Sequence, residues 1–125
     1  MTNTATQRIL LAEDDDAMRV YLERALVNAG YKVDSVDRGT AAVPLLVESD
    51  YDLLLSDIVM PEMDGISLAL QVSRDKPEMP IILITGFAKE RQRAHNLESL
   101  VHSIVPKPFD LEKICGIVKD ALNDR

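Results

Sequence analysis

The chain has little of several features that commonly decide a protein's class. Its one cysteine, Cys115, excludes an internal disulfide framework and fits a reducing compartment. It has no tryptophan and only 4% aromatic residues, so its core must consist mainly of Leu, Ile, Val and Ala. No apolar run approaches the roughly 18 residues that a membrane span needs, and the polar start MTNTATQR has no apolar signal region. We therefore expect a cytoplasmic protein with no membrane partner.

Positive charge is also scarce, because 21 acidic residues stand against 14 basic ones and the net charge is −7 at pH 7. Binding to nucleic acid needs a positive surface, so we expect no nucleic-acid partner. The acidic excess lies in residues 1–85, whereas residues 86–125 carry slightly more basic than acidic residues. This asymmetry indicates two chemically distinct faces, although ordinary variation in surface composition would give the same count.

Short apolar runs alternate five times with longer segments of helical period. Three runs (ILLA, LLL and IILI) are continuously apolar, which is typical of strands buried on both faces. The second and fifth runs are more polar, as edge strands are. The pattern predicts an α/β fold, a doubly wound five-stranded parallel sheet with strand order 2-1-3-4-5. The predicted strands are Ile9–Ala12, Tyr31–Val36, Asp52–Leu55, Ile81–Ile84 and His102–Val105.

Capping residues and apolar stripes predict the helices. Three helices are expected to begin at aspartate caps, namely Asp16, Asp64 and Asp110. The expected buried stripes are Met18, Leu22, Ala25 and Ala29 in the first helix, Ile66, Ala69 and Leu70 in the third, and Leu111, Ile114, Val118 and Leu122 in the last. Pro44 predicts a late start or a kink in the second helix, and the thin apolar face of Ala88–Leu100 makes it the weakest helix.

Carboxylates gather where the first and third strands end. The run Glu13–Asp16 follows the first strand, and Asp57 ends the third. In a doubly wound sheet these strand ends meet at the ligand-binding edge, and so much negative charge requires a cation or raised pKa values. Oxygen-only ligands suit Mg²⁺. A solvated acidic loop, with Asp57 capping a turn, is the structural alternative.

Two further strand ends carry groups that can bind an anion. The fourth strand ends at Thr85, whose hydroxyl can donate a hydrogen bond, and the fifth is followed by Lys107 between two prolines, of which Pro108 is a candidate for a cis bond. Such residues also occur in purely structural roles. With Asp57 as nucleophile, the set suits phosphoryl transfer to a carboxylate. No side chain in it resembles a base that activates water, which favours a phosphoryl group held for a time.

Together, these motifs resemble the response regulator receiver domains of bacterial two-component signalling. The resemblance runs from about Arg8 to Leu122. It rests on the acidic pair Glu13-Asp14, on Asp57 followed by MP and DG, on Thr85 and on KPF. It implies a flavodoxin-like (βα)5 fold, with a flexible tail over residues 1–7 and a receiver domain over residues 8–125. The motifs LLAEDDDAMR, SDIVMPEMDGI and ITGFA are similar to those of stand-alone CpdR-type receivers, which are linked to ATP-dependent protease delivery.

The resemblance also implies roles for individual residues. Asp57 would be phosphorylated by a histidine kinase or a histidine phosphotransfer protein, and Thr85 and Lys107 would contact the phosphoryl group. The Mg²⁺ ligands would be Glu13, Asp14, Asp57 and the backbone carbonyl of Val59. The chain would catalyse its own phosphorylation and lose the phosphate slowly, without being an enzyme that turns over a substrate.

The fourth helix, fifth strand and fifth helix would form the output face. Because no effector domain is expected after Asn123, output would pass by contact with another protein, such as protease-adaptor machinery, or by phosphate relay. Many receivers have an aromatic residue where this chain has Ile104, so we expect a readout by loop movement. Apolar Val59 and Phe87 are expected to hinder attack by water on the phosphorylated residue.

Three other functions share parts of this pattern. A haloacid-dehalogenase-type phosphatase would need an acid/base aspartate two residues after the nucleophile, where this chain has Val59. A flavin or nucleotide carrier would need a phosphate-binding loop after the first strand, and the acidic run Glu13–Asp16 would repel phosphate there. A passive adaptor with a degenerate site is disfavoured by the intact set.

Overall fold

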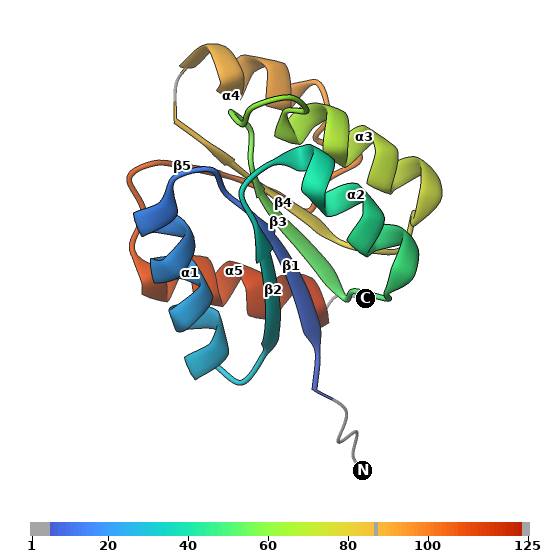
Figure 1. Cartoon of the computed structure of the whole chain (residues 1–125). Coiled ribbons are helices and arrows are strands. Elements are labelled where there is room, and N and C mark those ends of the chain that lie inside the picture. The colour runs from blue at the N-terminus through green and yellow to red at the C-terminus, as the bar shows by residue number, and fades with distance from the viewer. Residues whose placement is uncertain (1–5, 87, 124–125) are drawn as a thin grey trace.

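The computed structural model describes residues 6–86 and 88–123 and contains five successive strand–helix units. The strands and helices alternate along the chain without interruption, as the apolar pattern predicted (Figure 1). Their bounds are β1 Arg8–Ala12, α1 Asp16–Asn28, β2 Lys32–Val36, α2 Gly39–Glu48, β3 Leu53–Asp57, α3 Gly65–Asp75, β4 Ile81–Thr85, α4 Ala88–His95, β5 Ser103–Pro106 and α5 Leu111–Asn123.

The five strands form one parallel sheet in the order β2-β1-β3-β4-β5, which confirms the predicted topology. Every residue of β3 and β4 is buried, whereas β2 and β5, at the edges, are largely half-buried or exposed. Continuous apolar runs therefore mark the central strands, because helices cover both of their faces.

Two helical layers enclose the sheet (Figure 1). One core cluster lies between the sheet and α1 and α5, and the other lies between the sheet and α2, α3 and α4. Successive residues of a strand point to opposite faces, so Leu54 packs in the cluster under α2–α4 and Leu55 in the cluster under α1 and α5. Within the described residues, every helix falls short of the length and apolarity that crossing a bilayer requires.

The cap of α1 differs from the prediction. Asp15, not Asp16, is the capping residue, since its extended backbone lets its side chain accept a hydrogen bond from Met18 N at 3.0 Å. Asp16 already belongs to the first turn. The other two predicted caps are confirmed, because Asp64 accepts from Ser67 N at 2.8 Å and Asp110 accepts from the backbone N–H of Lys113 at 2.7 Å.

Two residues of the predicted buried stripes, Ala29 and Leu70, are exposed. Leu26 is buried in α1 and Ala29 is exposed, because Ala29 is the C-cap residue, beyond the last helical residue. In α3, Leu70 is 46% exposed, whereas Leu68 and Val72 are buried. The stripe in α3 therefore lies on a neighbouring arc of the helix, which places Leu70 at its solvent edge.

Two helices differ in extent from the sequence expectation. The helix α2 begins at Gly39 and contains Pro44, so of the two predicted alternatives the late start is wrong and the kink stays a prediction. The helix α4 ends at His95, and residues 96–100 form turns instead of continuing to Leu100. The thin apolar face of this segment offers little packing to hold a longer helix.

Candidate functional site

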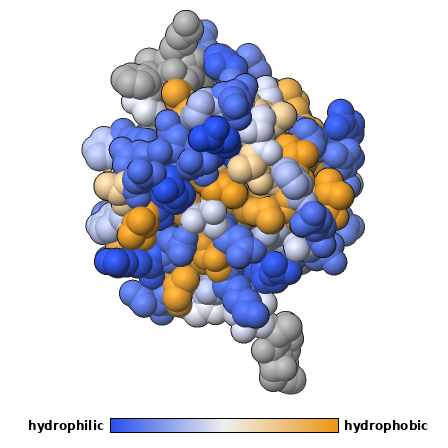
Figure 2. Space-filling view, viewed as in Figure 1, coloured by the Kyte–Doolittle hydropathy of each residue, from blue (hydrophilic) through white to orange (hydrophobic). Residues whose placement is uncertain are grey.

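The candidate site lies at the carboxyl edge of the sheet, where four strands end side by side. Strand register pairs Ala12 with Ser56, which brings the residue after β1 next to Asp57 at the end of β3. Asp57 in turn pairs with Ile84, and Thr85 pairs with Pro106. Parallel pairing therefore gathers the predicted residues from β1, β3, β4 and β5. In the space-filling view, hydrophilic residues cover much of the visible face, with hydrophobic residues between them (Figure 2).

Three carboxylates converge at this edge. Glu13, Asp14 and Asp57 each place one carboxylate oxygen within 4.8 Å of the others. Glu13 is fully buried and Asp57 is 4% exposed, while Asp14 is exposed. The juxtaposition predicted from the two strand ends is therefore present, with two of the three carboxylates removed from solvent.

The carboxylate of Glu13 is only half satisfied. Its Oε2 accepts a hydrogen bond from Asp15 N at 3.1 Å, but its buried Oε1 has no hydrogen-bond donor among the described residues and lies 3.8 Å from Lys107 Nζ. Burial raises the pKa of Glu13 to about 7, and the neighbouring charge of Asp57 adds to the rise. Glu13 therefore exchanges its proton near neutral pH.

Asp57 is held by one backbone amide and one ammonium group. Its Oδ1 accepts from Ile58 N at 2.9 Å, and its Oδ2 accepts from Lys107 Nζ at 3.3 Å. Partial burial alone would lower the pKa of Lys107, but the charges of Asp57 and Glu13 outweigh it and raise that pKa. Lys107 therefore remains a cation facing both carboxylates.

The backbone around Lys107 supports this placement. Its N–H donates to the carbonyl of Thr85 at 2.7 Å, and the Lys107–Pro108 bond is cis, as predicted. Thr85 itself is fully buried, and its hydroxyl has no hydrogen-bond partner among the described residues. A buried, unpaired hydroxyl costs free energy, so Thr85 carries a donor that a ligand in the site could use.

The loop after β3 depends on Gly65, the glycine of the DG motif, for a close backbone approach that the sequence alone did not show. A Cβ atom on Gly65 would lie 2.2 Å from the carbonyl oxygen of Asp57 and 2.9 Å from the Cα atom of Ile58. Gly65 N also donates to the carbonyl of Ile58 at 2.8 Å. Only glycine permits this approach of α3 to the end of β3.

Two arginines at this edge were missed by sequence reasoning. Arg19 donates to the backbone carbonyl of Glu13 at 3.0 Å, and Arg93 of α4 donates to Asp64 at 2.9 Å. The only available signal for Arg19 was its position three residues after Asp16, on the same side of α1. Arg93 is distant from Asp64 in the sequence, and only the fold brings them together.

Two other predicted residues add less to the site. The side chain of Val59 is 47% exposed, and the role of its carbonyl stays a prediction. Phe87 lies outside the described residues, so its predicted shielding role also stays a prediction.

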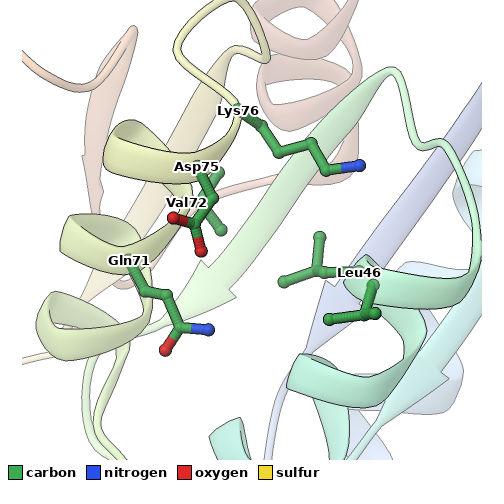
Figure 3. A pocket seen from close by; sticks show the side chains of 6 residues that line it. Leu46, Gln71, Val72, Asp75 and Lys76 are labelled. Atoms are coloured by element: carbon green, nitrogen blue, oxygen red, sulfur yellow. The ribbon is translucent and has the colours of Figure 1, made fainter.

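A small hollow elsewhere on the molecule does not compete with this site. It lies between the C-terminal parts of α2 and α3, toward the amino edge of the sheet, and has a volume of about 90 Å³ (Figure 3). Sites for small molecules usually measure about 300–1,000 Å³. Its lining residues are Leu46, Val47, Gln71, Val72, Asp75 and Lys76.

The carboxylates at the carboxyl edge fit a hard divalent cation. Mg²⁺ prefers oxygen ligands, keeps several waters and needs only one or two carboxylates. Glu13, Asp14 and Asp57 supply such oxygens. The buried Oε1 of Glu13 has no hydrogen-bond donor among the described residues, and a bound cation would compensate for the missing donor. The donor set present in this chain therefore suits Mg²⁺.

A five-stranded doubly wound sheet with these residues at its carboxyl edge is the arrangement of a receiver domain. The family model described as the response regulator receiver domain matches residues 9–119. The chain therefore belongs to the response regulator receiver domain family of two-component systems, which confirms the resemblance drawn from its motifs.

Among curated proteins, the chain is similar to the response regulator receiver protein CpdR of Brucella abortus (strain 2308), with 42% identity over 116 residues, or 93% of the chain and 97% of CpdR. It is 34% identical to the sensor kinase CckA of the same strain over 91% of the chain and 12% of the kinase. It is 31% identical to the transcriptional regulator NtrC of Escherichia coli (strain K12) over 92% of the chain and 24% of NtrC. The chain thus corresponds to nearly all of CpdR but to one segment of the larger relatives.

Solved receiver structures share the fold. The signal receiver domain of an HD domain-containing protein from Pseudomonas fluorescens Pf-5 is 25% identical, with a TM-score of 0.90 over 99% of this chain and 92% of that one. The response regulator TrrA from Thermotoga maritima, in complex with Mg²⁺ and BeF, is 28% identical, with a TM-score of 0.84 over 93% of this chain and 99% of TrrA.

Proposed function

We propose that this receiver domain is a phosphoacceptor switch in which Asp57 takes a phosphoryl group from a histidine kinase or a histidine phosphotransfer protein. The observation that carries the proposal is the position of the Asp57 carboxylate, 3.3 Å from the Lys107 ammonium and beside the carboxylates of Glu13 and Asp14. An isolated surface aspartate would need neither a partly buried ammonium nor two more acids beside it.

In the proposed reaction, one carboxylate oxygen of Asp57 attacks the phosphorus of a phosphohistidine. The new P–O bond forms as the P–N bond breaks, and the imidazole leaves with the bonding electron pair. Lys107 would neutralise charge on the phosphoryl oxygens, and the unpaired hydroxyl of Thr85 would donate a hydrogen bond to one of them. No oxidant or further reactant is required.

Glu13, Asp14, Asp57 and the backbone carbonyl of Val59 are proposed to hold Mg²⁺. The ion would add positive charge opposite the phosphoryl oxygens, as it does in other phosphoryl transfers. The proposal is supported by the cluster of carboxylate oxygens and by the likeness to TrrA, whose structure contains Mg²⁺ and BeF. For the chain itself, the two acids at the end of β1 would orient the ion beside Asp57.

The proposed output is a change in the surface formed by α4, β5 and α5, which alters binding to a partner protein. Support comes from backbone connectivity, since the hydrogen bond between Lys107 N and the Thr85 carbonyl joins the ends of β4 and β5. Ile104 of β5 is partly buried against the core under α2–α4 and has no aromatic ring to rotate. A pull-down comparing the beryllofluoride-loaded and bare forms would identify the partner.

Phosphorylation by a small acyl-phosphate donor tests the proposal directly. We expect Mg²⁺-dependent addition of one phosphoryl group, detected by mass spectrometry, and its complete loss in Asp57→Asn. Asp120→Asn is the matched control, because Asp120 is an exposed aspartate on α5. Labelling that persists in Asp57→Asn, or that does not depend on magnesium, would contradict the proposal. A phosphorylated half-life of only seconds would contradict the predicted shielding by Val59 and Phe87.

A further inference from the structure

Arg19 lies in α1, directly after the acidic run. Its Nη1 donates to the backbone carbonyl of Glu13 at 3.0 Å, and its Nη2 donates to Asp16 Oδ1 at 2.6 Å. The side chain as a whole is only 20% exposed, so most of it is covered. Neither hydrogen bond goes to a carboxylate oxygen that is proposed to hold the metal. Arg19 therefore acts on the backbone of the loop that carries those carboxylates.

The contact with the Glu13 carbonyl has a geometric consequence. The peptide between Glu13 and Asp14 is planar, so holding its carbonyl oxygen restricts the orientation of the whole unit. On the other side, Glu13 N donates to the carbonyl of Val36 at 3.0 Å, and Glu13 Oε2 accepts from Asp15 N at 3.1 Å. Glu13 is thus bonded through its N–H, its carbonyl and one carboxylate oxygen, which leaves Oε1 facing Lys107.

We propose that Arg19 is a positioning residue for the metal site. By holding the Glu13 carbonyl, it sets the orientation of the Glu13–Asp14 peptide and thereby directs both carboxylates toward Asp57. This inference rests on the proposed function, because it concerns the binding of Mg²⁺ by those carboxylates. It assigns the support of the site to a residue that contacts neither the phosphoryl group nor the ion.

The direction in which magnesium affinity changes when Arg19 is removed distinguishes a positioning role from a purely electrostatic one. A nearby guanidinium repels a divalent cation, so charge alone predicts that removing Arg19 strengthens magnesium binding. Loss of a positioning contact predicts the reverse, because the carboxylates would have to be ordered again on binding. Outer contacts that orient metal ligands typically contribute about 10- to 100-fold in metal affinity.

The test is a titration of the full chain with magnesium chloride, in which calorimetry and the NMR shifts of backbone amides report binding. We expect Arg19→Gln to bind Mg²⁺ about tenfold more weakly than the unmodified protein. Arg24→Gln is the matched control, since Arg24 is exposed on the same helix and its side chain makes no hydrogen bond or ion pair with another described residue. Its removal should change the affinity by less than about twofold in moderate salt.

Affinity of Arg19→Gln that is equal to or tighter than that of the unmodified protein would overturn the inference. If this variant gives no cooperative thermal transition, Arg19→Lys decides the question instead. Its ammonium keeps the charge but cannot hold the carbonyl and Asp16 with a planar fork, so its affinity should also fall, whereas Arg24→Lys should not. Unmodified protein that binds no magnesium would contradict the proposed function as well, which distinguishes that failure from the failure of Arg19 alone.

Discussion

The two ends of the sheet carry similar charged groups, but those at the amino end are paired with one another and those at the carboxyl end are only partly paired. At the amino end, the guanidinium of Arg8 lies 4.9 Å from the ring centroid of Tyr51 and 3.4 Å from Asp34 Oδ2. The Tyr51 hydroxyl donates to the same oxygen at 2.7 Å, and Asp52 accepts from Arg8 N at 2.7 Å. Each of these charged groups has a partner.

At the carboxyl end, the buried acidic groups outnumber the groups that pair with them. Two buried carboxylates, on Glu13 and Asp57, share the single ammonium of Lys107. Glu13 Oε1 and Thr85 Oγ1 are buried without a hydrogen bond within the described residues. Such unpaired groups lower stability, and folded proteins keep them mainly where a ligand or reaction uses them. Incomplete pairing, more than the presence of charge, distinguishes the functional end.

Glycine substitutions should show the largest contrast between the two ends. Gly65→Ala at the carboxyl end should lower the free energy of unfolding by roughly 3 kcal/mol, because its Cβ would overlap the Asp57 carbonyl. Gly30→Ala, before β2 at the amino end, should cost only about 1 kcal/mol, because its φ of 104° is strained but nothing lies within 4 Å.

Urea denaturation measures both values. Gly116→Ala is the control, since the added Cβ in α5 meets no atom within 4 Å and should stabilise the helix by up to about 1 kcal/mol. Equal losses for Gly65→Ala and Gly30→Ala would show that the close backbone approach under Asp57 carries no special cost.

The pH dependence of stability should come from the carboxyl end. Because the pKa of Glu13 is raised from 4.5 to about 7, the unfolded chain releases this proton more easily than the folded one. Metal-free protein should therefore lose stability, on the order of 2 kcal/mol, as pH rises from about 4.5 through 7. At the amino end, burial raises the pKa of Tyr51 to about 12, and the hydrogen bond with Asp34 adds to the rise, so Tyr51 contributes nothing to this window.

Thermal unfolding in a chelator at a series of pH values tests this expectation, and Glu13→Gln should flatten the curve. Magnesium binding should show the opposite trend, because the ion needs the ionised carboxylate and should bind more tightly as pH rises through 7. A metal-free stability that increases with pH over this range would contradict the assignment to Glu13.

Removing one acid should have opposite effects at the two ends. Asp57→Asn should stabilise metal-free protein by about 1 kcal/mol at pH 8, because it removes a buried charge beside Glu13 while keeping an oxygen for Ile58 N. Asp34→Ala should destabilise by about 1 kcal/mol, because it leaves Tyr51 and Arg8 without their shared acceptor. The melting temperatures of the two variants test this expectation. A change in melting temperature of the same sign in both variants would contradict the difference between the two ends.

The exposed pair between α4 and α3 should give the smallest effect. Arg93 and Asp64 are 49% and 27% exposed, so Arg93→Gln should cost at most about 0.5 kcal/mol, and less in high salt. Arg74→Gln is a suitable comparison, because Arg74 is more exposed and, among the described residues, pairs only with its sequence neighbour Asp75. A loss of unfolding free energy above 1 kcal/mol, or one that salt does not reduce, would show that Arg93 supports the site as a buried residue would.

Much of the fold was predictable because its signals are local. Continuous apolar runs marked β1, β3 and β4, since burial on both faces leaves no room for alternation. The boundaries were less accurate, because strands end where hydrogen-bonded pairing ends and not where apolar residues stop. Strand β3 continues to Asp57, which pairs with Ile84, although the apolar run ends at Leu55.

The cap of α1 shows a different limit. Four consecutive acids precede the helix, and each has a side chain that can cap. The choice of Asp15 depended on backbone angles at the end of β1, which the bonding of Glu13 to Val36 and Arg19 constrains. Composition at a single position could not distinguish Asp15 from Asp16.

The sequence by itself determined the order of the elements, the strand order and the identity of the acids, hydroxyl and lysine at the strand ends, because period, capping and strand-end position are local properties. Tertiary structure alone decided which of those groups are buried, which oxygen of Glu13 is left unpaired, and which atoms Gly65 and Arg19 contact at the site. These features arise from contacts between residues far apart in the sequence, such as those of Lys107 with Asp57 and with Glu13. Such contacts depend on register and packing, which no local pattern specifies.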